Sequence, residues 1–487
     1  MVEEKFSQTG NFWIDFGIVS LWDYLLKGKH PIHFKENLEF KARNDVAVCL
    51  SPDALVLSGG ERAIDDTLNE SLNELKNAVW GKTRKGKDWW KPEPSFFFKQ
   101  FGKKIDALLQ TPNKLKKSGK FRKRNTCNFC GQSNNNVGLV RLSEQPLIVT
   151  KDKMMTFYSG FKGKINICTN CTFASHFAPA RIQGVFSKMA GNTLNMMIPE
   201  ATDLIDLARL LHWFGQEEVV KRVQTPLFGG FQNILETSMK FLFETWKMLD
   251  EKGLKVDEEF GPKTKRFHVA QLRSEKKVTQ VIRYYLLPDI YAIFNAFNCT
   301  KYLTREGKTL HTFEGVFNHF YFRTPKLDTH TREELSYFII HRMDLCELIE
   351  KFLYERELTR GEHLKDSFLI REFGLFVEFY EGRMIKVEES VLGTCKSVGE
   401  NLGELAFNVD DAGILYTLRS VRNLDDFLAS LQSFLTRYVK ELQPKFYRKA
   451  LDDLLMVIND KNWKRFKALV GIYAVLKYMG LEVEKRR

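Results

Sequence analysis

Two Cys-x-x-Cys pairs constrain this chain most, Cys127/Cys130 in TCNFCG and Cys168/Cys171 in ICTNCT. Two such turns place four thiolates in a tetrahedron around one zinc ion, at about 2.3 Å per Zn–S bond. Four sulfur ligands leave no open coordination position, so we expect one structural Zn²⁺ that contributes to folding and activates no water. Iron–sulfur ligation and a thiol redox pair are the alternatives for the same spacing.

The segment between the pairs predicts a zinc ribbon over residues 125–175. Strand-like runs occupy residues 137–142 and 146–150, and a third run, KINIC, leads into the second pair. Short strands pinned at their base by a metal fit this order. His176 lies five residues beyond Cys171 and could replace a cysteine ligand. The alternative for His176 is an ordinary loop or surface histidine.

Four further cysteines, Cys49, Cys299, Cys346 and Cys395, are scattered singly. In a reducing compartment such singletons are expected to be small buried apolar side chains. No apolar run approaches the ~20 residues that span a bilayer, and the N-terminus lacks the basic-then-apolar order of a signal peptide. We therefore expect a cytoplasmic protein without a membrane partner.

Positive charge is concentrated directly before the first cysteine pair. Residues 82–124 hold fifteen Lys and Arg against three acids, a local balance of +12 in a chain whose net charge is +13. A like-charge cluster repels itself unless something anionic lies against it, and aromatic residues interleaved with cations are what bases stack on. Nucleic acid is the predicted partner of this basic segment, and a solvated basic surface is the alternative. The candidate contacts nearest the cysteines are Lys114, Lys116, Lys117, Lys120, Arg122, Lys123 and Arg124.

Two short motifs in the ribbon add weaker candidates. The loop GQSNNNVG carries Asn134, Asn135 and Asn136, whose amides can pair with base edges, and a plain polar turn is the alternative that general turn chemistry favours. The motif GFKG, with Lys162 and Lys164 in and after it, resembles a Gly-x-x-Gly backbone clamp, and a turn between strands is the alternative.

Apolar periodicity predicts the elements around the ribbon. A helix is expected near the N-terminus, where apolar residues recur at helical spacing from residue 18 to residue 26, with Asp15 capping its start. Residues 46–50 and 54–58 are predicted to be buried strands, and residues 65–79 and 201–249 are predicted to be mainly helical. A second basic stretch at residues 263–283 is expected to be a surface strand or loop that could touch phosphate. The rest of residues 179–341 carries no strong signal.

The last third of the chain has almost continuous helical spacing. Apolar residues form one stripe over residues 424–442, and helical segments at 445–458 and 461–479 follow after short connections, which is the layout of an antiparallel helical bundle. Lys464 and Arg465 lie at the start of the final segment, where the helix dipole disfavours cations. Phosphate of a bound strand would favour them there, and a solvated helix end is the alternative.

These patterns together predict a mixed α+β, mainly helical fold. With 487 residues and 44% hydrophobic content, the chain is long enough for several domains. We expect an N-terminal α+β domain over residues 1–340 with the zinc ribbon inserted, and a C-terminal helical bundle over residues 341–487. Phosphate loops, metalloprotease helices and nucleophile elbows do not occur in the sequence. We therefore expect a protein that is not an enzyme. The alternatives are a zinc-ribbon enzyme that acts on RNA or DNA and a scaffold that binds only protein.

The opening TGNFWIDFGIVSLWDYL, the basic approach to a Cys-x-x-Cys, the distant second pair and the helical tail resemble one known family. It is the CXXC–CXXC family of CRISPR-associated proteins, the large subunit of the type I-B Cascade surveillance complex. The resemblance covers the whole chain in arrangement, while its motifs are the N-terminal segment and the two cysteine pairs.

The resemblance implies a non-catalytic subunit in antiviral defence. Such a subunit binds the 5′ end of the guide RNA, recognises the protospacer-adjacent motif in double-stranded target DNA and supports strand opening, while guide pairing reads the target. The implied partners are guide RNA, target DNA with its displaced strand, the backbone, 5′-handle-binding and small subunits of Cascade, and a helicase-nuclease recruited after target binding. Separate translation of the helical tail, from Met343 or Met384, is implied in the same way.

Overall fold

The structure is a computed structural model of the chain, and it is mixed α+β and mainly helical, as predicted. It describes residues 1–27, 37–75, 125–134, 137–141, 164–181, 183–187, 193–214, 233–260, 265–275, 278–287, 290–304, 309–321, 331–359, 367–438 and 444–486. Within these residues, no helix has the length and apolar character needed to cross a membrane.

The chain divides into two compact units, Met1–Tyr291 and Ala292–Arg487. Residues 292–340 therefore pack with the helical tail. The division between two functional domains at residues 340 and 341 stays a prediction.

A four-stranded antiparallel sheet opens the first unit, with strand order β1-β4-β3-β2. Two of its strands confirm the buried strands predicted at residues 46–50 and 54–58. The helix predicted from residue 65 begins earlier, at Glu61, and the part of that prediction beyond residue 75 lies outside the described residues. The elements are β1 (Val2–Ser7), β2 (Leu38–Lys41), a 3-10 turn η1 (Arg43–Asp45), β3 (Ala47–Leu50), β4 (Ala54–Gly59) and α2 (Glu61–Leu75).

The predicted N-terminal helix is present as α1 (Phe12–Leu26) and is almost entirely buried. The prediction that Asp15 caps it is wrong. Asn11 is the N-cap, and its side chain accepts hydrogen bonds from the backbone of Trp13 and Ile14. Asp15 lies one turn inside the helix and instead accepts the backbone N–H groups of Thr9 and Gly10, at 2.8 and 2.9 Å, which fixes the chain that enters the helix.

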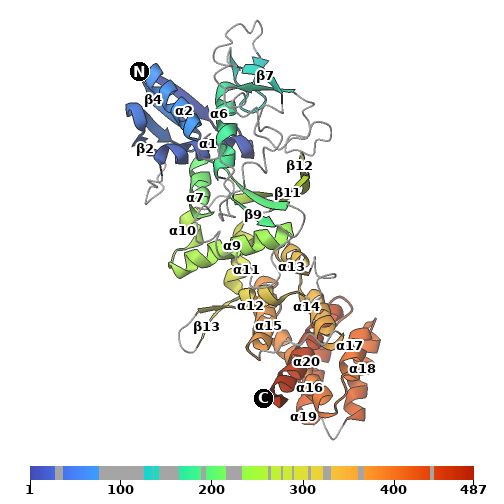
Figure 1. Cartoon of the computed structure of the whole chain (residues 1–487). Coiled ribbons are helices and arrows are strands. Elements are labelled where there is room, and N and C mark those ends of the chain that lie inside the picture. Colours follow the sequence, from blue (N-terminus) through green and yellow to red (C-terminus); the bar gives the residue numbers. More distant parts are fainter. Residues whose placement is uncertain are drawn as a thin grey trace. The chain divides into compact units, whose positions relative to one another are not determined.

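The ribbon consists of two small hairpins followed by a helix. The elements are β5 (Asn125–Thr126) paired with β6 (Ser133–Asn134), β7 (Val137–Arg141) paired with β8 (Lys164–Cys168), and α6 (Thr169–Arg181). The strands predicted at 137–142 and at KINIC are confirmed, and the run at residues 146–150 lies outside the described residues. Helix α6 packs against α1 (Figure 1), and these two helices belong to one buried core with the first sheet.

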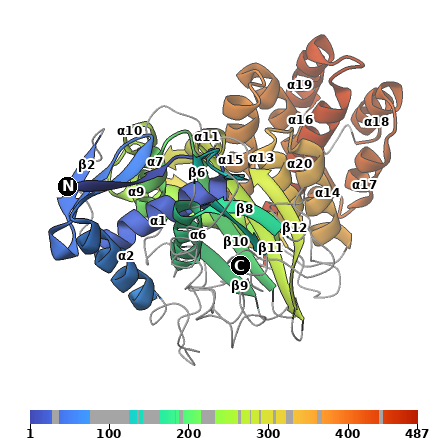
Figure 2. The ribbon, with the colours of Figure 1, turned by 90° about the horizontal axis from the view of Figure 1, so that it is seen from above.

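A second antiparallel sheet was not predicted from the sequence. Its strand order is β12-β11-β10-β9, and Figure 2 shows these strands lying side by side. Its strands and the neighbouring helices are β9 (Gln183–Ser187), β10 (Thr193–Ala201), α7 (Leu204–Phe214), α9 (Ile234–Glu251), α10 (Val256–Phe260), β11 (Lys265–Glu275) and β12 (Val278–Leu287).

Within the second basic stretch, residues 265–275 form β11 and residues 278–283 belong to β12, which agrees with the strand of the predicted strand or loop. Lys265 nevertheless departs from the expected surface position. Its side chain is fully buried, and its Nζ lies 2.7 Å from Oδ2 of Asp206. A buried ammonium group needs a charged partner of this kind, so Lys265 is part of the buried core.

The second unit is built mainly of helices (Figure 1). Its first elements are α11 (Ile290–Cys299), β13 (Lys301–Leu303), β14 (Thr309–His311), α12 (Thr312–His319), α13 (Thr331–Ile340), α14 (Cys346–Leu353) and a π-helical turn η4 (Tyr354–Thr359). They continue with α15 (Ser367–Phe379), a second π-helical turn η5 (Tyr380–Met384), α16 (Glu389–Asn408), α17 (Gly413–Ser420), α18 (Leu424–Arg437), α19 (Pro444–Val457) and α20 (Trp463–Lys485).

Helices α16 and α20 pack closely against each other. A Cβ at Gly399 would lie 2.5 Å from the carbonyl oxygen of Val470, and one at Gly403 would lie 2.3 Å from that of Ala474. Both helices advance by four residues together, so they run parallel where they touch. The predicted bundle helices are present. The antiparallel layout was predicted for helices that follow one another in the chain, and a parallel contact between α16 and α20, which have three helices between them, is compatible with it.

Candidate metal centre and nucleic-acid residues

The first cysteine pair lies in a tight turn that follows β5. The backbone N–H of Cys127 donates to the carbonyl oxygen of Gln132 at 2.8 Å, and that of Gly131 donates to Cys127 at 3.1 Å. Gly131 has a φ of +70°, a left-handed conformation that favours glycine. The turn therefore brings Cys130 back beside Cys127.

The second pair lies at a junction between a strand and a helix. Cys168 is the last residue of β8, and Cys171 lies in the first turn of α6. The backbone N–H of Cys171 points at the Sγ of Cys168, at 3.4 Å, and the hydroxyl of Thr172 donates to the carbonyl oxygen of Cys168 at 2.9 Å. This junction turns both sulfurs toward the same point.

Two asparagines join the two turns. The backbone N–H of Asn128 donates to the carbonyl oxygen of Asn166 at 2.9 Å, and the Oδ1 of Asn128 accepts the N–H of Asn166 at 2.8 Å. The N–H of Cys168 also points at the Sγ of Cys127, at 3.4 Å. Neither asparagine was predicted from the sequence, because only the pairing of distant segments gives them this role.

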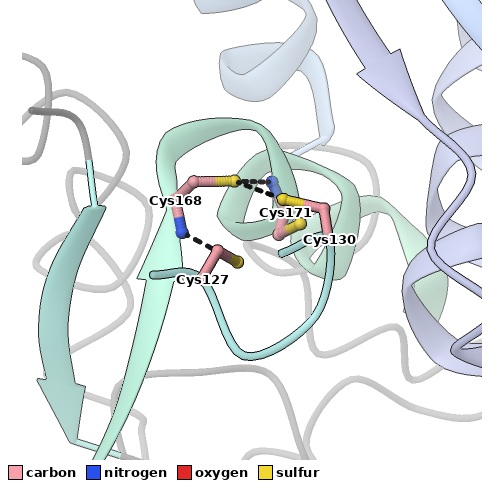
Figure 3. Close-up of side chains that lie close together, drawn as sticks. All are labelled: Cys127, Cys130, Cys168 and Cys171. Carbon is pink, nitrogen blue, oxygen red and sulfur yellow. Dashed lines mark hydrogen bonds between the residues drawn. The ribbon is translucent and has the colours of Figure 1, made fainter. Parts of the chain in front are cut away.

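The four thiols converge on one point, as Figure 3 shows. Their Sγ atoms all lie within 4.8 Å of one another, and those of Cys130 and Cys168 are 3.7 Å apart. In a four-thiolate zinc site with Zn–S bonds of 2.3 Å, neighbouring sulfurs are about 3.8 Å apart. The donor set and the spacing therefore fit a tetrahedral thiophilic cation such as zinc, with no open position.

Without a bound cation, the four thiols interact with one another, and their pKa values move in opposite directions. Hydrogen bonding from Cys130, and then from Cys168 and Cys171, holds the pKa of the Cys127 thiol far below its usual range. Hydrogen bonding to Cys127, and then to Cys130 and Cys168, raises the pKa of Cys171. The metal-free cluster therefore holds at least one thiolate beside thiols, and cation binding displaces the remaining protons.

The cluster lies against the core of the first unit. A small cavity beside it is lined by Phe6, Ile14 and Ile18 together with Cys130, Cys168 and Cys171. The side-chain amide of Asn170 donates to the carbonyl oxygen of Lys5 in β1, at 2.8 Å. The metal centre is thus attached to β1 and α1 and does not form an independent finger.

His176 occupies neither of its two predicted positions. It lies inside α6, fully buried, and its Nδ1 contacts the carbonyl oxygen of Thr172 at 2.5 Å. It is outside the four-residue cluster. Of the single cysteines, Cys346 and Cys395 are buried as expected, whereas Cys49 and Cys299 are partly exposed.

A second group of potential ligands, Asp344, Cys346 and Glu381, has a structural explanation. Asp344 accepts the backbone N–H of Cys346 at 2.8 Å, and Glu381 accepts that of Leu345 at 3.0 Å, so both carboxyl groups bind the start of α14. Burial, and then the charge of Asp344, raises the pKa of Glu381 to about 8. The guanidinium of Arg465 pairs with Asp344.

Most of the residues predicted to contact nucleic acid are not among the residues that the structure describes. Lys114, Lys116, Lys117, Lys120, Arg122, Lys123, Arg124, Asn135, Asn136 and Lys162 lie outside the described residues. Asn134 ends β6, and Lys164 begins β8, so both belong to the hairpins that carry the cysteines. Lys464 is exposed in the first turn of α20, whereas Arg465 beside it is engaged with Asp344.

One comparison with known families bears on this ribbon. A family model described as CRISPR-associated protein (Cas_CXXC_CXXC) matches residues 120–183, which include both cysteine pairs, β5 to β8 and α6. A search of curated proteins gave no match. The family match supports a CRISPR-associated protein.

Proposed function

We propose that this chain is the non-catalytic large subunit of a type I-B Cascade, an RNA-guided CRISPR interference complex. The observation that carries the proposal is the family match over residues 120–183, where the four thiols converge. A closed four-thiolate site supports a structural Zn²⁺, because it has no position left for water or substrate.

The basic segment at residues 82–124 is the proposed grip on duplex DNA next to the target. It carries the chain's excess of positive charge and leads directly into the match, which begins at residue 120. Lys and Arg at this density bind phosphate regardless of sequence, so the segment supplies affinity and position. The ribbon, attached to β1 and α1, is a rigid base for it. Guide pairing then supplies target sequence recognition.

Isolation of the protein from its native cell, followed by sequencing of the bound nucleic acid, tests the assignment. We expect guide RNAs that share one repeat-derived 5′ sequence, together with co-purifying Cascade subunits. Absence of such RNA would contradict the proposal. Metal-dependent cleavage of RNA or DNA by the chain alone would favour a zinc-ribbon enzyme instead, and failure to bind any nucleic acid at low salt would favour a protein-binding scaffold.

The basic segment is tested by replacing Lys116, Lys117, Arg122, Lys123 and Arg124 together with Gln. Each phosphate contact contributes about 0.9 to the slope of log affinity against log salt, so replacing five cations should reduce the magnitude of the slope by up to about 4.5. A charge-matched control replaces exposed cations elsewhere, at Lys41, Arg62, Lys351, Lys386 and Lys449. Equal slopes for the two variants would remove the basic segment from the proposal.

A further inference from the structure

Strand β12 presents consecutive large side chains to solvent at the edge of the second sheet. Tyr284 is 44% exposed, Tyr285 is 38% exposed and Leu286 is 45% exposed. Among the described residues, β12 pairs only with β11. Sheet edges are usually protected by charge, proline or a covering element, so three exposed apolar side chains in a row indicate a surface that binds something.

The ring of Tyr284 is held in a defined position by its hydroxyl group. The hydroxyl lies 2.5 Å from Nδ1 of His268 in β11, and Nε2 of His268 lies 2.8 Å from Oε2 of Glu200 in β10. An imidazole protonated at Nε2 donates to Glu200 and accepts the hydroxyl proton at Nδ1, so one tautomer satisfies both contacts. Three neighbouring strands thus contribute one residue each to this chain of contacts.

Helix α1 holds His268, the middle residue of these contacts, in place. The ring of Phe12 stacks on the imidazole of His268, with centroids 3.7 Å apart and planes 15° from parallel. Only 7% of His268 is exposed. Burial, and then the charge of Glu200, raises the pKa of Tyr284, which keeps its phenol neutral. Tyr284 is therefore a neutral aromatic residue whose hydroxyl group is held in place and whose ring is partly exposed to solvent.

Two exposed cations lie on the strands that carry His268 and Tyr284. Arg283 precedes Tyr284 in β12 and is exposed, and Arg266 is exposed in β11. Residues 263–283 contain seven Lys and Arg against one acid, Glu275. One of the seven, Lys265, is buried with Asp206. Exposed aromatic rings among cations complement a polyanion with stacking bases better than they complement an apolar protein surface.

We propose that Tyr284, Tyr285 and Arg283 form a binding site for single-stranded nucleic acid at the edge of β12. Side chains alternate along β12, so Arg283 and Tyr285 lie on one face of the sheet and Tyr284 lies on the other. A nucleic-acid strand that follows the edge of the sheet contacts side chains of both faces. Bases stack on the rings, and the guanidinium binds phosphate. A duplex does not fit, because its base faces are already covered by neighbouring bases. The site stands apart from the basic segment and does not depend on the CRISPR assignment.

The first test measures binding of the full-length chain to a fluorescent oligothymidine of about 20 nucleotides, a length that exceeds one stacking site. Tyr284→Ala should weaken binding about tenfold, the loss expected for one base stacked on an aromatic ring. Tyr284→Phe keeps the ring but loses its contact with His268, so it should have a smaller effect. The matched control is Tyr416→Ala, which removes a tyrosine 39% exposed in α17 of the other unit and should leave binding unchanged.

The second test needs no substitution of the sheet. An oligonucleotide that carries 5-iodouracil is irradiated in complex with the unmodified chain, and the cross-linked peptide is identified by mass spectrometry. We expect the link at Tyr284 or Tyr285. Affinity within twofold of wild type for a folded Tyr284→Ala variant, or cross-links only outside β12, would overturn the inference.

The two proposals fail separately. If the variant of the basic segment loses duplex binding while Tyr284→Ala keeps full oligothymidine affinity, the edge site is wrong and the proposed function stands. If Tyr284→Ala loses oligothymidine affinity but no guide RNA co-purifies, the edge site stands and the Cascade assignment is wrong.

Discussion

Gly17 in α1 lies directly against the backbone of Ala174 in α6, so closely that a Cβ at Gly17 would be 2.1 Å from the carbonyl oxygen of Ala174. Helix α6 carries Cys171 in its first turn. The N-terminal helix and the second cysteine pair, which are separate motifs in the sequence, therefore form one packed structure.

This contact predicts that Gly17→Ala destabilises the first unit. The added methyl group meets backbone, which cannot move aside as a flexible side chain would, and such overpacking costs about 1–3 kcal/mol. The free energy of unfolding, measured in urea, should fall, and zinc should be lost to a chelator more quickly. Gly393→Ala in α16 is the control, because a Cβ there meets nothing within 4 Å. An unchanged Gly17→Ala variant would show that the two helices are further apart than described.

The cysteine cluster predicts one zinc ion per chain that depends on all four thiols. Replacement of Cys127 or Cys168 by Ser removes one of four soft ligands, so metal analysis of the purified variant should find zinc reduced from one equivalent toward none. Cys49→Ser changes a partly exposed cysteine outside the cluster and should retain the metal. A full equivalent of zinc in both ligand variants would contradict the four-thiolate site.

The buried pair of Lys265 and Asp206 predicts strong coupling between the two residues. Asp206→Asn leaves an ammonium without its anion in the core, which should cost about 3–5 kcal/mol. The double variant, Lys265→Met with Asp206→Leu, removes both charges and should cost clearly less than the sum of Lys265→Met and Asp206→Leu made singly. Lys255→Met is the control, since Lys255 pairs with Glu258 in solvent, and it should be silent in the same unfolding assay. If the losses of unfolding free energy in the two single variants add up to the loss in the double variant, Lys265 and Asp206 do not form a buried ion pair.

Glu350 in α14 predicts that the second unit loses stability as the pH rises. Burial raises the pKa of Glu350 to about 7 from 4.5, against the opposing charges of Lys467 and Arg419. The unfolded chain releases this proton above pH 4.5 while the folded chain keeps it, so stability falls as the pH rises from 4.5 to about 7. The loss should amount to at most about 3 kcal/mol.

Glu350→Gln should remove the part of the pH dependence that comes from Glu350, because an amide has no proton to lose, while the part that comes from Glu381 remains. Urea unfolding followed at pH 5 and pH 8 measures it, with Glu404→Gln, an exposed carboxyl on α16, as the control. Parallel pH profiles for wild type and Glu350→Gln would show that Glu350 is ionised in the folded protein.

Several elements were predictable from local sequence. The hydrophobic spacing after residue 18 was enough for α1, and continuous apolar runs were enough for β3 and β4, because burial of an apolar face follows from the period of the pattern. The ligand set was also predictable, since cysteines two residues apart reach one ion from a single turn. The cap of α1 was assigned to the wrong residue, because Asp15 and Asn11 are both good acceptors and only the entering backbone decides between them.

The sequence alone determined the mainly helical α+β class, the four candidate ligands and the uneven charge, because each depends on residues close together in the chain. Tertiary structure decided everything that depends on pairing between distant segments. It placed His176 and Lys265 in the core, ran α16 parallel to α20, and joined Glu200, His268 and Tyr284 from three strands. It also set the cysteine pairs against α1, where the close approach at Gly17 turns two local motifs into one rigid site.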